Sequence, residues 1–414
     1  MSGKKRKAVS KARPAKPEGW TTRGRKPRTE WEQAFWRYLA ITVVMSVMYV
    51  IYRWHPYYNR NNFKPWHPFF ESVYWTWVVL GIPYCVVTLR KFGGRKMDLT
   101  DGAVHWAILF RGIFNWLMEE CRWPSHIWKN RRMRVSVLSL GVKAFFTPLM
   151  LTFMVEHWGN MAALWMKRKG VPMLTQEQLG QMNGLEVVAR VTAWWDYLAE
   201  TVPRLLPTWQ GFLDFINVSR WAPGEKWFVF DLYYQLLFFV DTIWALTGYA
   251  AESRWLGNKT KSVEPTGFGW MVALMCYPPF NDISGTYFPL GRSGTLFNDE
   301  SLLVACRVAM LAAFTIYVAA TIAFGPTFSN LTNRGIITRG PYAFIRHPAY
   351  ACKNFAWWME YLPNAGSPTT FLWLICWNII YGLRAWTEER HLSKDPEYVA
   401  YKKKVPYVAI PGII

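Results

Sequence analysis

LLVACRVAMLAAFTIYVAATIAFG, residues 302–325, is the clearest membrane-spanning segment of this sequence. About 20 apolar residues in a helix cross the roughly 30 Å hydrocarbon core of a bilayer, and Arg307 is the one charged residue within this stretch. Lipid offers no hydrogen bonds to backbone amides and carbonyls, so a spanning segment of this kind is expected to be helical. The stretch therefore predicts a membrane protein with an all-α fold.

Further apolar segments predict additional spans before and after this one. Residues 104–118 are shorter and contain Arg111, and we expect them to be interfacial or re-entrant. Residues 353–362 and 369–386 are expected to form a C-terminal helical hairpin. The sequence thus predicts a multi-pass transmembrane bundle of about seven to eight spans. The remaining predicted spans are 36–53, 72–90, 136–156, 227–250 and 267–282, the last of which contains Pro278 and Pro279.

Composition and charge agree with a membrane protein that contacts anionic lipid. Of the 414 residues, 52% are hydrophobic and 18% are charged, below the roughly 25% charged residues of soluble domains. The net charge of +21 is concentrated in residues 1–30 and in short loops beside the spans, as the positive-inside rule predicts for cytoplasmic segments. We therefore expect cytoplasmic termini and contacts with anionic headgroups. Nucleic acid is not an expected partner, because no zinc or helix-turn-helix signature accompanies the charge.

Common catalytic and cofactor motifs are missing from this sequence. It contains no H-E-x-x-H, G-x-S-x-G, P-loop or G-x-G-x-x-G motif. Its seven histidines show no metal-ligand spacing, so no metal site is expected. Polar residues gather instead in three blocks near the C-terminus: NRGIITRGPYAFIRHPAYACKNF at 333–355, RAWTEERHL at 384–392 and EYVAYKKKVPYVAIPGI at 397–413.

The predicted hairpin brings the first two of these blocks together. Arg346, His347 and Tyr350 precede or begin its first arm, and Glu388 and Glu389 follow its second arm. Ionisable groups beside a membrane span are costly unless they are paired or used. We therefore expect one polar pocket at the cytoplasmic end of the hairpin.

The order and spacing of the blocks resemble those of isoprenylcysteine carboxyl methyltransferases, whose core is shared by phospholipid N-methyltransferases. The resemblance covers about residues 326–414 and rests on R-G-P-Y-x-x-x-R-H-P-x-Y, the hairpin, E-E-x-x-L and Y-x-x-Y-K-K-x-V-P. It implies S-adenosylmethionine as methyl donor and a membrane lipid or a prenylated group as substrate. The sequence departs from the family pattern at Cys352-Lys353-Asn354, where many members have small residues.

The resemblance also implies roles for individual residues. Glutamates suit the ammonium or the ribose hydroxyls of S-adenosylmethionine, and an arginine suits its carboxylate. A tyrosine ring suits its sulfonium or its adenine. Arg346, His347 and Arg384 are implied as catalytic residues, with Arg384 near the substrate. The implied cofactor-binding residues are Gly340, Pro341, Tyr342, Arg346, His347, Pro348, Tyr350, Glu388 and Glu389.

Acidic residues inside a predicted span are functional candidates, because a charge there is costly. Asp241 is expected either to line a substrate pocket with Tyr233 and Tyr234 or to pair with an arginine such as Arg307. The segment 277–282 is expected either to cap that pocket or to break a helix. The residues predicted to contact the substrate are Tyr234, Asp241 and Arg384.

These observations predict three regions and one leading function. The regions are a disordered basic cytoplasmic tail at 1–33, a transmembrane region with interfacial helices at 34–300, and a methyltransferase-like membrane core at 301–414. The predicted function is methyl transfer from S-adenosylmethionine to a carboxylate, phosphate or amine on a lipid-like or prenylated substrate. The membrane is expected to be a plasma or inner membrane or the endoplasmic reticulum. An NADPH-dependent sterol or enone reductase with a related R-H-P-x-Y core, and a non-catalytic transporter or scaffold, are alternatives.

Overall fold

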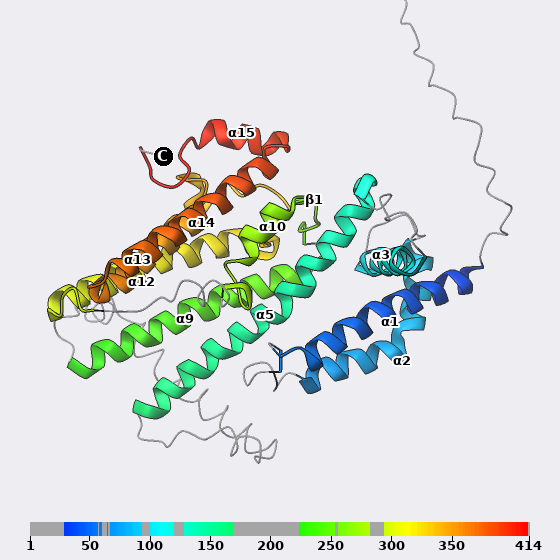
Figure 1. Ribbon diagram of the computed structural model, residues 1–414, viewed down its shortest axis with the longest axis horizontal. Coiled ribbons are helices and arrows are strands. Elements are labelled where there is room, and N and C mark those ends of the chain that lie inside the picture. Colours follow the sequence, from blue (N-terminus) through cyan, green and yellow to red (C-terminus); the bar gives the residue numbers. More distant parts are fainter. Residues whose placement is uncertain are drawn as a thin grey trace, which may run out of the picture.

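The computed structural model describes residues 29–56, 58–59, 64, 67–92, 99–119, 128–168, 223–252, 256–281 and 294–412. These residues are nearly all helical, which confirms the predicted all-α fold. Two short strands, β1 (Ser262–Val263) and β2 (Thr332–Asn333), form an antiparallel pair. The helices are α1 (Glu30–Trp54), α2 (His67–Phe92), α3 (Leu99–Glu119), α5 (Arg131–Arg168), α9 (Pro223–Ala250), α10 (Gly267–Leu274), α12 (Glu300–Phe324), α13 (Pro348–Tyr361), α14 (Pro368–Leu392) and α15 (Pro396–Lys404), with single 3-10 turns η3 (Gly325–Thr327), η4 (Gly340–Ala343) and η5 (Leu362–Asn364) (Figure 1).

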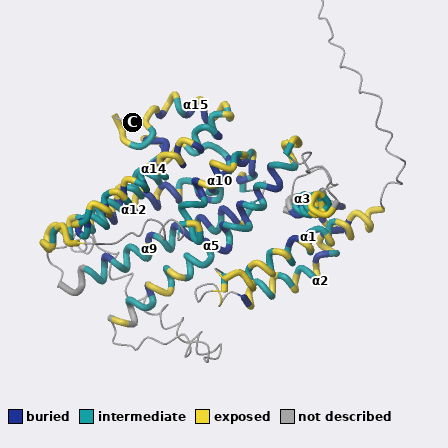
Figure 2. The backbone as a smooth tube through the Cα atoms, viewed as in Figure 1, coloured by how far each residue is buried: buried dark blue, intermediate teal, exposed yellow. Residues whose placement is uncertain are grey.

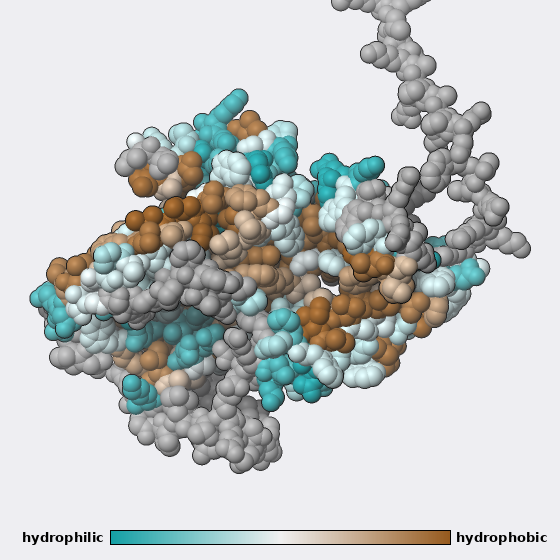
Figure 3. Space-filling model, viewed as in Figure 1, coloured by the Kyte–Doolittle hydropathy of each residue, from teal (hydrophilic) through white to brown (hydrophobic). Residues whose placement is uncertain are grey.

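Five of the described helices are long and apolar enough to cross a membrane: α1, α2, α5, α9 and α12. This number is smaller than the seven to eight spans predicted from the sequence. Exposed positions follow the outer faces of α1, α2 and α14 (Figure 2). Apolar side chains gather on the surface over α14 and near α1, whereas polar ones gather over α15 (Figure 3). The protein is therefore an integral membrane protein whose outer helix faces suit lipid.

The predicted N-terminal tail mostly falls outside the described residues, which begin at Thr29. The end of the predicted 1–33 segment is helical, because α1 already begins at Glu30. Thr29 and Glu32 form a capping box there, in which each side chain accepts a hydrogen bond from the other residue's amide. Most of the mixed segment before α9, residues 169–222, also lies outside the described residues.

The prediction of a spanning helix at 267–282 is wrong. Helix α10 starts at the Thr266 cap and ends at Leu274 after eight residues, or about 12 Å of rise. Pro278 and Pro279 follow shortly after its end, and a proline cannot donate the amide hydrogen bond that would continue a helix. This segment therefore breaks the helix, one of the two alternatives left open for 277–282.

The described residues just after β1 and just before α12 lie at opposite ends of the bundle. Strand β1 pairs with β2, which follows the C-terminal end of α12. Gly294 lies at the opposite end, where its carbonyl accepts a hydrogen bond from the Gly366 amide in the turn between α13 and α14. Helices α9 and α12 therefore run parallel and finish at the same end of the bundle. We call this the pocket end, because the cavity described below lies there.

Helix α3 differs in direction from its neighbours. It is seen end-on in Figure 1, whereas α1, α2 and α5 run across the view. Its Trp106 indole donates to the Val137 carbonyl at 2.8 Å, near the start of α5. A helix lying across the spans near the N-terminal end of α5 has the orientation of an interfacial helix, one of the alternatives predicted for 104–118.

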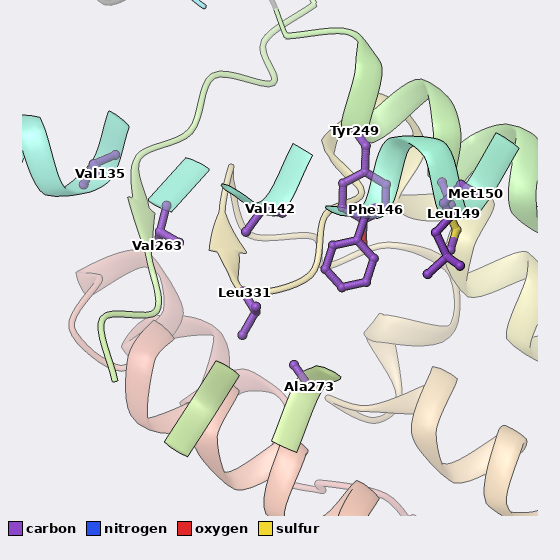
Figure 4. Packing of buried hydrophobic residues seen from close by; sticks show 10 residues of the cluster. Val135, Val142, Phe146, Leu149, Met150, Tyr249, Val263, Ala273 and Leu331 are labelled. Carbon is purple, nitrogen blue, oxygen red and sulfur yellow. The ribbon is translucent and has the colours of Figure 1, made fainter. Parts of the chain in front are cut away.

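Two buried clusters hold the bundle around the site. One joins α5, α9, α10 and the strand pair, and in it the rings of Phe146 and Tyr249 stack at 4.9 Å between centroids (Figure 4). The other joins α9, α12 and α13 around Phe314 and Met310, which are fully buried. Because both clusters include α9, the loop after α12 and the hairpin are fixed against the same helix.

Candidate functional site

The loop after α12 turns sharply at Gly340, which begins η4. Gly340 has a φ of 61°, and a Cβ there would lie 3.2 Å from the Cβ of Ala323. Glycine adopts this left-handed conformation without the steric cost that other residues meet. Pro341 follows in the first turn of η4, and Tyr342 is buried against Phe324 at 4.8 Å between ring centroids. The R-G-P-Y block therefore sets the path of the chain into the site.

Arg346 holds the C-terminal segment against the start of α13. Its guanidinium donates to the carbonyls of Val405 at 2.9 Å and Pro406 at 2.6 Å. Its own amide donates to the Tyr407 carbonyl at 2.9 Å. Buried guanidinium groups need such partners because desolvation of an unpaired charge is costly. The V-P block after α15 is therefore bound through Arg346.

Glu389 lies at the centre of this network. Arg346 Nε is 2.6 Å and Lys402 Nζ is 2.9 Å from its carboxylate oxygens, and His347 Nε2 is 3.4 Å away. Burial alone would raise the pKa of Glu389, but the nearby His347 and the hydrogen bonds from Arg346 and Lys402 hold this pKa well below its usual range. Glu389 is thus ionised at neutral pH and is engaged by protein groups. We call Arg346, His347, Glu389 and Lys402 the ionic network.

A cavity of about 140 Å³ lies at the pocket end, between α12, the loop after it, α13, α14 and α15. Six of the predicted cofactor-site and catalytic residues line it: Tyr342, Arg346, His347, Tyr350, Arg384 and Glu388. The predicted residues that do not line it are Gly340, Pro341, Pro348, Glu389, Asp241 and Tyr234. The structure therefore brings together the residues of the first two sequence blocks, but separates the two adjacent glutamates.

Tyr350, Arg384 and Glu388 form the polar side of this cavity. The Tyr350 hydroxyl donates to Glu388 Oε1, which bridges the two arms of the hairpin. Arg384 Nε is 3.8 Å from the same carboxylate oxygen, and the guanidinium carbon lies 5.0 Å from the centre of the Tyr350 ring. Although the Arg384 side chain is only 5% exposed, its Nε has no hydrogen-bond partner among the described residues. We call these three residues the cavity triad.

Several cavity residues were not identified from the sequence. Asn330 accepts a hydrogen bond from the Arg384 guanidinium, and Tyr381 contributes a ring 6.0 Å from it. Neither residue belongs to a recognisable motif in the sequence. Tyr277 also lines this cavity, which is not the Asp241 pocket that 277–282 was expected to cap, and lies 5.5 Å from the Arg384 guanidinium. Asp282 lies outside the described residues.

Asp231 and Asp241 of α9 have different partners. Asp231 pairs with Arg307 at 2.8 Å, so the arginine considered for Asp241 binds Asp231 instead. Asp241 is buried and accepts hydrogen bonds from Tyr317 at 2.8 Å and Thr321 at 2.6 Å. Tyr234 lines a separate cleft with Asp231 and Arg307, away from the cavity triad. Asp241 thus lies behind the cavity wall, and Tyr234 belongs to another surface.

A second ionic group fixes the end of α14 to the strand pair. Glu264, which is buried, lies 2.9 Å from Arg390 and 3.6 Å from His391 Nδ1. Ser262 on β1 lies 3.0 Å from His391 Nε2. Burial lowers the pKa of His391, although the charge of Glu264 opposes this effect. These contacts orient the last turns of α14 and with them Glu388.

The comparisons with known proteins agree with this geometry. The isoprenylcysteine carboxyl methyltransferase family model matches residues 302–394. The match runs from α12 to the end of α14, so it contains the cavity triad, Arg346, His347 and Glu389. It confirms the resemblance predicted for the C-terminal core and supports membrane methyltransferase chemistry in general.

The match leaves α1 to α10 and α15 outside. No curated protein and no solved structure matches the chain. Within the described residues, no group of three or more histidine, cysteine, aspartate or glutamate side chains is arranged to hold a metal ion.

Proposed function

We propose that the protein is an S-adenosylmethionine-dependent methyltransferase that acts on a lipid-like or prenylated membrane substrate. The observation that carries this proposal is the cavity triad. Tyr350 and Glu388, from opposite arms of the hairpin, are joined across a cavity that Arg384 also lines. All three residues fall within the segment that matches the methyltransferase family.

The side chains around the cavity suit the chemical groups of this donor. S-adenosylmethionine supplies an electrophilic methyl group on a sulfonium, next to an ammonium, a carboxylate, a ribose and an adenine. The half-buried Glu388 carboxylate suits the ammonium or the ribose hydroxyls. The rings of Tyr342, Tyr350 and Tyr381 line the same cavity and suit the sulfonium or the adenine.

Arg384 is the residue best placed to bind the acceptor. Its Nε is buried and has no hydrogen-bond partner in the part of the chain that the structure describes, although its guanidinium also contacts Asn330. An unpaired buried donor is costly, so an anionic oxygen of an acceptor would satisfy it. An anionic acceptor needs no general base, in contrast to an amine, which must first lose a proton.

Arg346, His347 and Glu389 have a positioning role in this proposal. The Arg346 guanidinium is engaged by Glu389 and by two backbone carbonyls. His347 stacks on the Tyr350 ring, with ring centroids 5.5 Å apart and planes 8° apart. These contacts fix the Tyr350 side of the cavity, and accurate alignment of donor and acceptor supplies much of the rate in such a transfer.

The proposal is tested by measuring binding of S-adenosylmethionine to the purified full chain by calorimetry. We expect wild-type protein and a Glu397→Gln control to bind it, and Glu388→Gln to bind it more weakly. Glu397 is an exposed glutamate that pairs with Lys261, outside the cavity. Radiolabelled donor is then supplied with membrane lipid extract or a prenylated cysteine to detect transfer.

Absence of donor binding by the wild-type chain would overturn the proposal. Binding and consumption of NADPH, dependent on Arg346, would replace it with the reductase alternative.

A further inference from the structure

Lys353, where the sequence departs from the family pattern, lines the same cavity as the triad. It lies on α13, six residues after His347, or about 9 Å further along the helix. This direction leads away from the pocket end and into the membrane-spanning part of the bundle. Lys353 therefore places a positive charge on the membrane side of the cavity.

The Lys353 ammonium is surrounded by aromatic rings. It lies 4.9 Å from the centre of the Tyr317 ring, 5.9 Å from that of Trp357 and 6.0 Å from that of Phe238. Cation–π contacts stabilise an ammonium, but they do not replace its hydrogen bonds. Within the described part of the chain, this ammonium has no hydrogen bond and no close ion pair.

Asp241 is an acidic residue behind the cavity wall that interacts electrostatically with Lys353. Its oxygens accept the hydroxyls of Tyr317 and Thr321. Asp241 itself does not line the cavity. Lys353 thus lines the cavity with an ammonium that has no hydrogen bond to the described residues.

Lys353 and Arg384 belong to one aromatic cluster. Trp357, which contacts Lys353, packs edge-on against Tyr381 at 5.3 Å between ring centroids. Tyr381 in turn lies 6.0 Å from the Arg384 guanidinium. Two cations that lack a full set of partners therefore face the same cavity from α13 and α14.

We propose that Lys353 is a specificity-determining residue that binds the anionic headgroup of the acceptor on the membrane side of the cavity. This inference rests on the proposed function and deepens it, because it assigns acceptor selection to a residue outside the family pattern. A carboxylate or phosphate oxygen held there attacks the methyl carbon, so that a C–O bond forms and the C–S bond breaks. The C–S electron pair stays on sulfur, and no proton moves.

The experiment compares oleate, oleyl alcohol and oleylamine as probes that share one chain and differ in headgroup charge. Their binding to the full chain in detergent is measured by native mass spectrometry. We expect wild-type protein to prefer oleate, and Lys353→Met to bind oleate about tenfold more weakly, because a charge-assisted hydrogen bond is lost. Binding of oleyl alcohol should not change, and Lys353→Arg should retain most of the preference.

Asp241→Asn provides a second variant with an effect of the opposite sign. The amide oxygen can still accept a hydroxyl, but the negative charge that offsets Lys353 is removed. We therefore expect Asp241→Asn to bind oleate a few-fold more tightly. A purely structural role for this pair predicts weaker binding in both variants, and that result would overturn the inference.

The affinity for S-adenosylhomocysteine shows whether Lys353 binds the acceptor or the carboxylate of the donor. We expect its affinity to be equal in wild-type protein, Lys353→Met and the exposed control Lys261→Met. If Lys353→Met weakens S-adenosylhomocysteine and leaves oleate unchanged, Lys353 binds the donor and the inference fails while the proposed function stands. If wild-type protein binds neither S-adenosylmethionine nor S-adenosylhomocysteine, the proposed function fails, and the inference fails with it.

Discussion

On the cavity side of the last turns of α14, Arg384 and Glu388 meet Tyr350, and no described residue forms a hydrogen bond with Arg384 Nε. On the other side, Glu389 accepts from Arg346 and Lys402 and lies beside His347. The two glutamates are adjacent in sequence, but successive residues of a helix point about 100° apart. Charges that the protein already satisfies support structure, whereas charges that it leaves partly unsatisfied are suited to bind a ligand. The predictions below test this contrast between the ionic network and the cavity triad.

The largest effect is expected from Glu389→Ala. Removing one partner of a buried ion pair leaves Arg346, whose side chain is 7% exposed, with an uncompensated charge. We expect the free energy of unfolding to fall by about 3 kcal/mol or more, visible as a lower Tm in detergent. Glu397→Ala is the matched control, because Glu397 also lies 2.9 Å from a lysine but is 65% exposed. Equal effects of the two substitutions would contradict a central role for the ionic network.

The pH dependence of stability tests the same network. The pKa of Glu389 is lowered in the folded protein, so its stabilising contribution is fully present above the unfolded pKa of about 4.3. This contribution is lost as the pH falls below that value towards the folded pKa. We therefore expect the difference in Tm between wild type and Glu389→Gln to shrink when the pH is lowered from about 6 to about 3. A constant difference over this range would show that Glu389 is not held as a carboxylate.

Glu388→Gln is expected to act on binding instead of stability. Glu388 is 28% exposed and its carboxylate faces the cavity. We expect the Kd for S-adenosylmethionine to rise about tenfold, because one charge-assisted contact is lost. The Tm should stay close to that of the wild type. A large loss of Tm with unchanged Kd would reverse the roles assigned to the two glutamates.

Gly340→Ala, in the turn that leads into the site, should have the smallest effect on stability and on donor affinity. The positive φ of Gly340 costs other residues about 1–2 kcal/mol, and the added methyl group meets Ala323 at 3.2 Å. We expect a modest decrease in Tm and a small loss of donor affinity. Ala substitution at Gly382, where a Cβ has nothing within 4 Å, is the control. Full tolerance at Gly340 would show that this turn adapts without strain.

Part of the site was predictable because its residues lie at helix ends that the apolar pattern defines. The hairpin arm at 353–362 falls within α13 except for its last residue, the arm at 369–386 falls within α14, and the predicted proximity of Tyr350 and Glu388 is observed. The prediction at 267–282 failed because apolar composition was counted as a span across Pro278 and Pro279. The segment before α12 instead lies beside the turn between α13 and α14, where the Gly366 amide donates to the Gly294 carbonyl.

The sequence by itself determined that this is an all-α membrane protein with its polar chemistry near the C-terminus. The length and apolarity of a segment are local properties that can be read directly from the sequence. The spacing of the motif blocks is also fixed by the sequence and does not depend on how the hairpin packs. Only the tertiary structure decided that Glu389 supports Arg346 while Glu388 faces the cavity, and that Arg307 pairs with Asp231 and not with Asp241. It also decided that Lys353 and Asp241, 112 positions apart in the sequence, act on each other across the wall of one cavity. These pairings depend on how each helix is rotated against its neighbours, and that rotation is set by packing across the whole bundle.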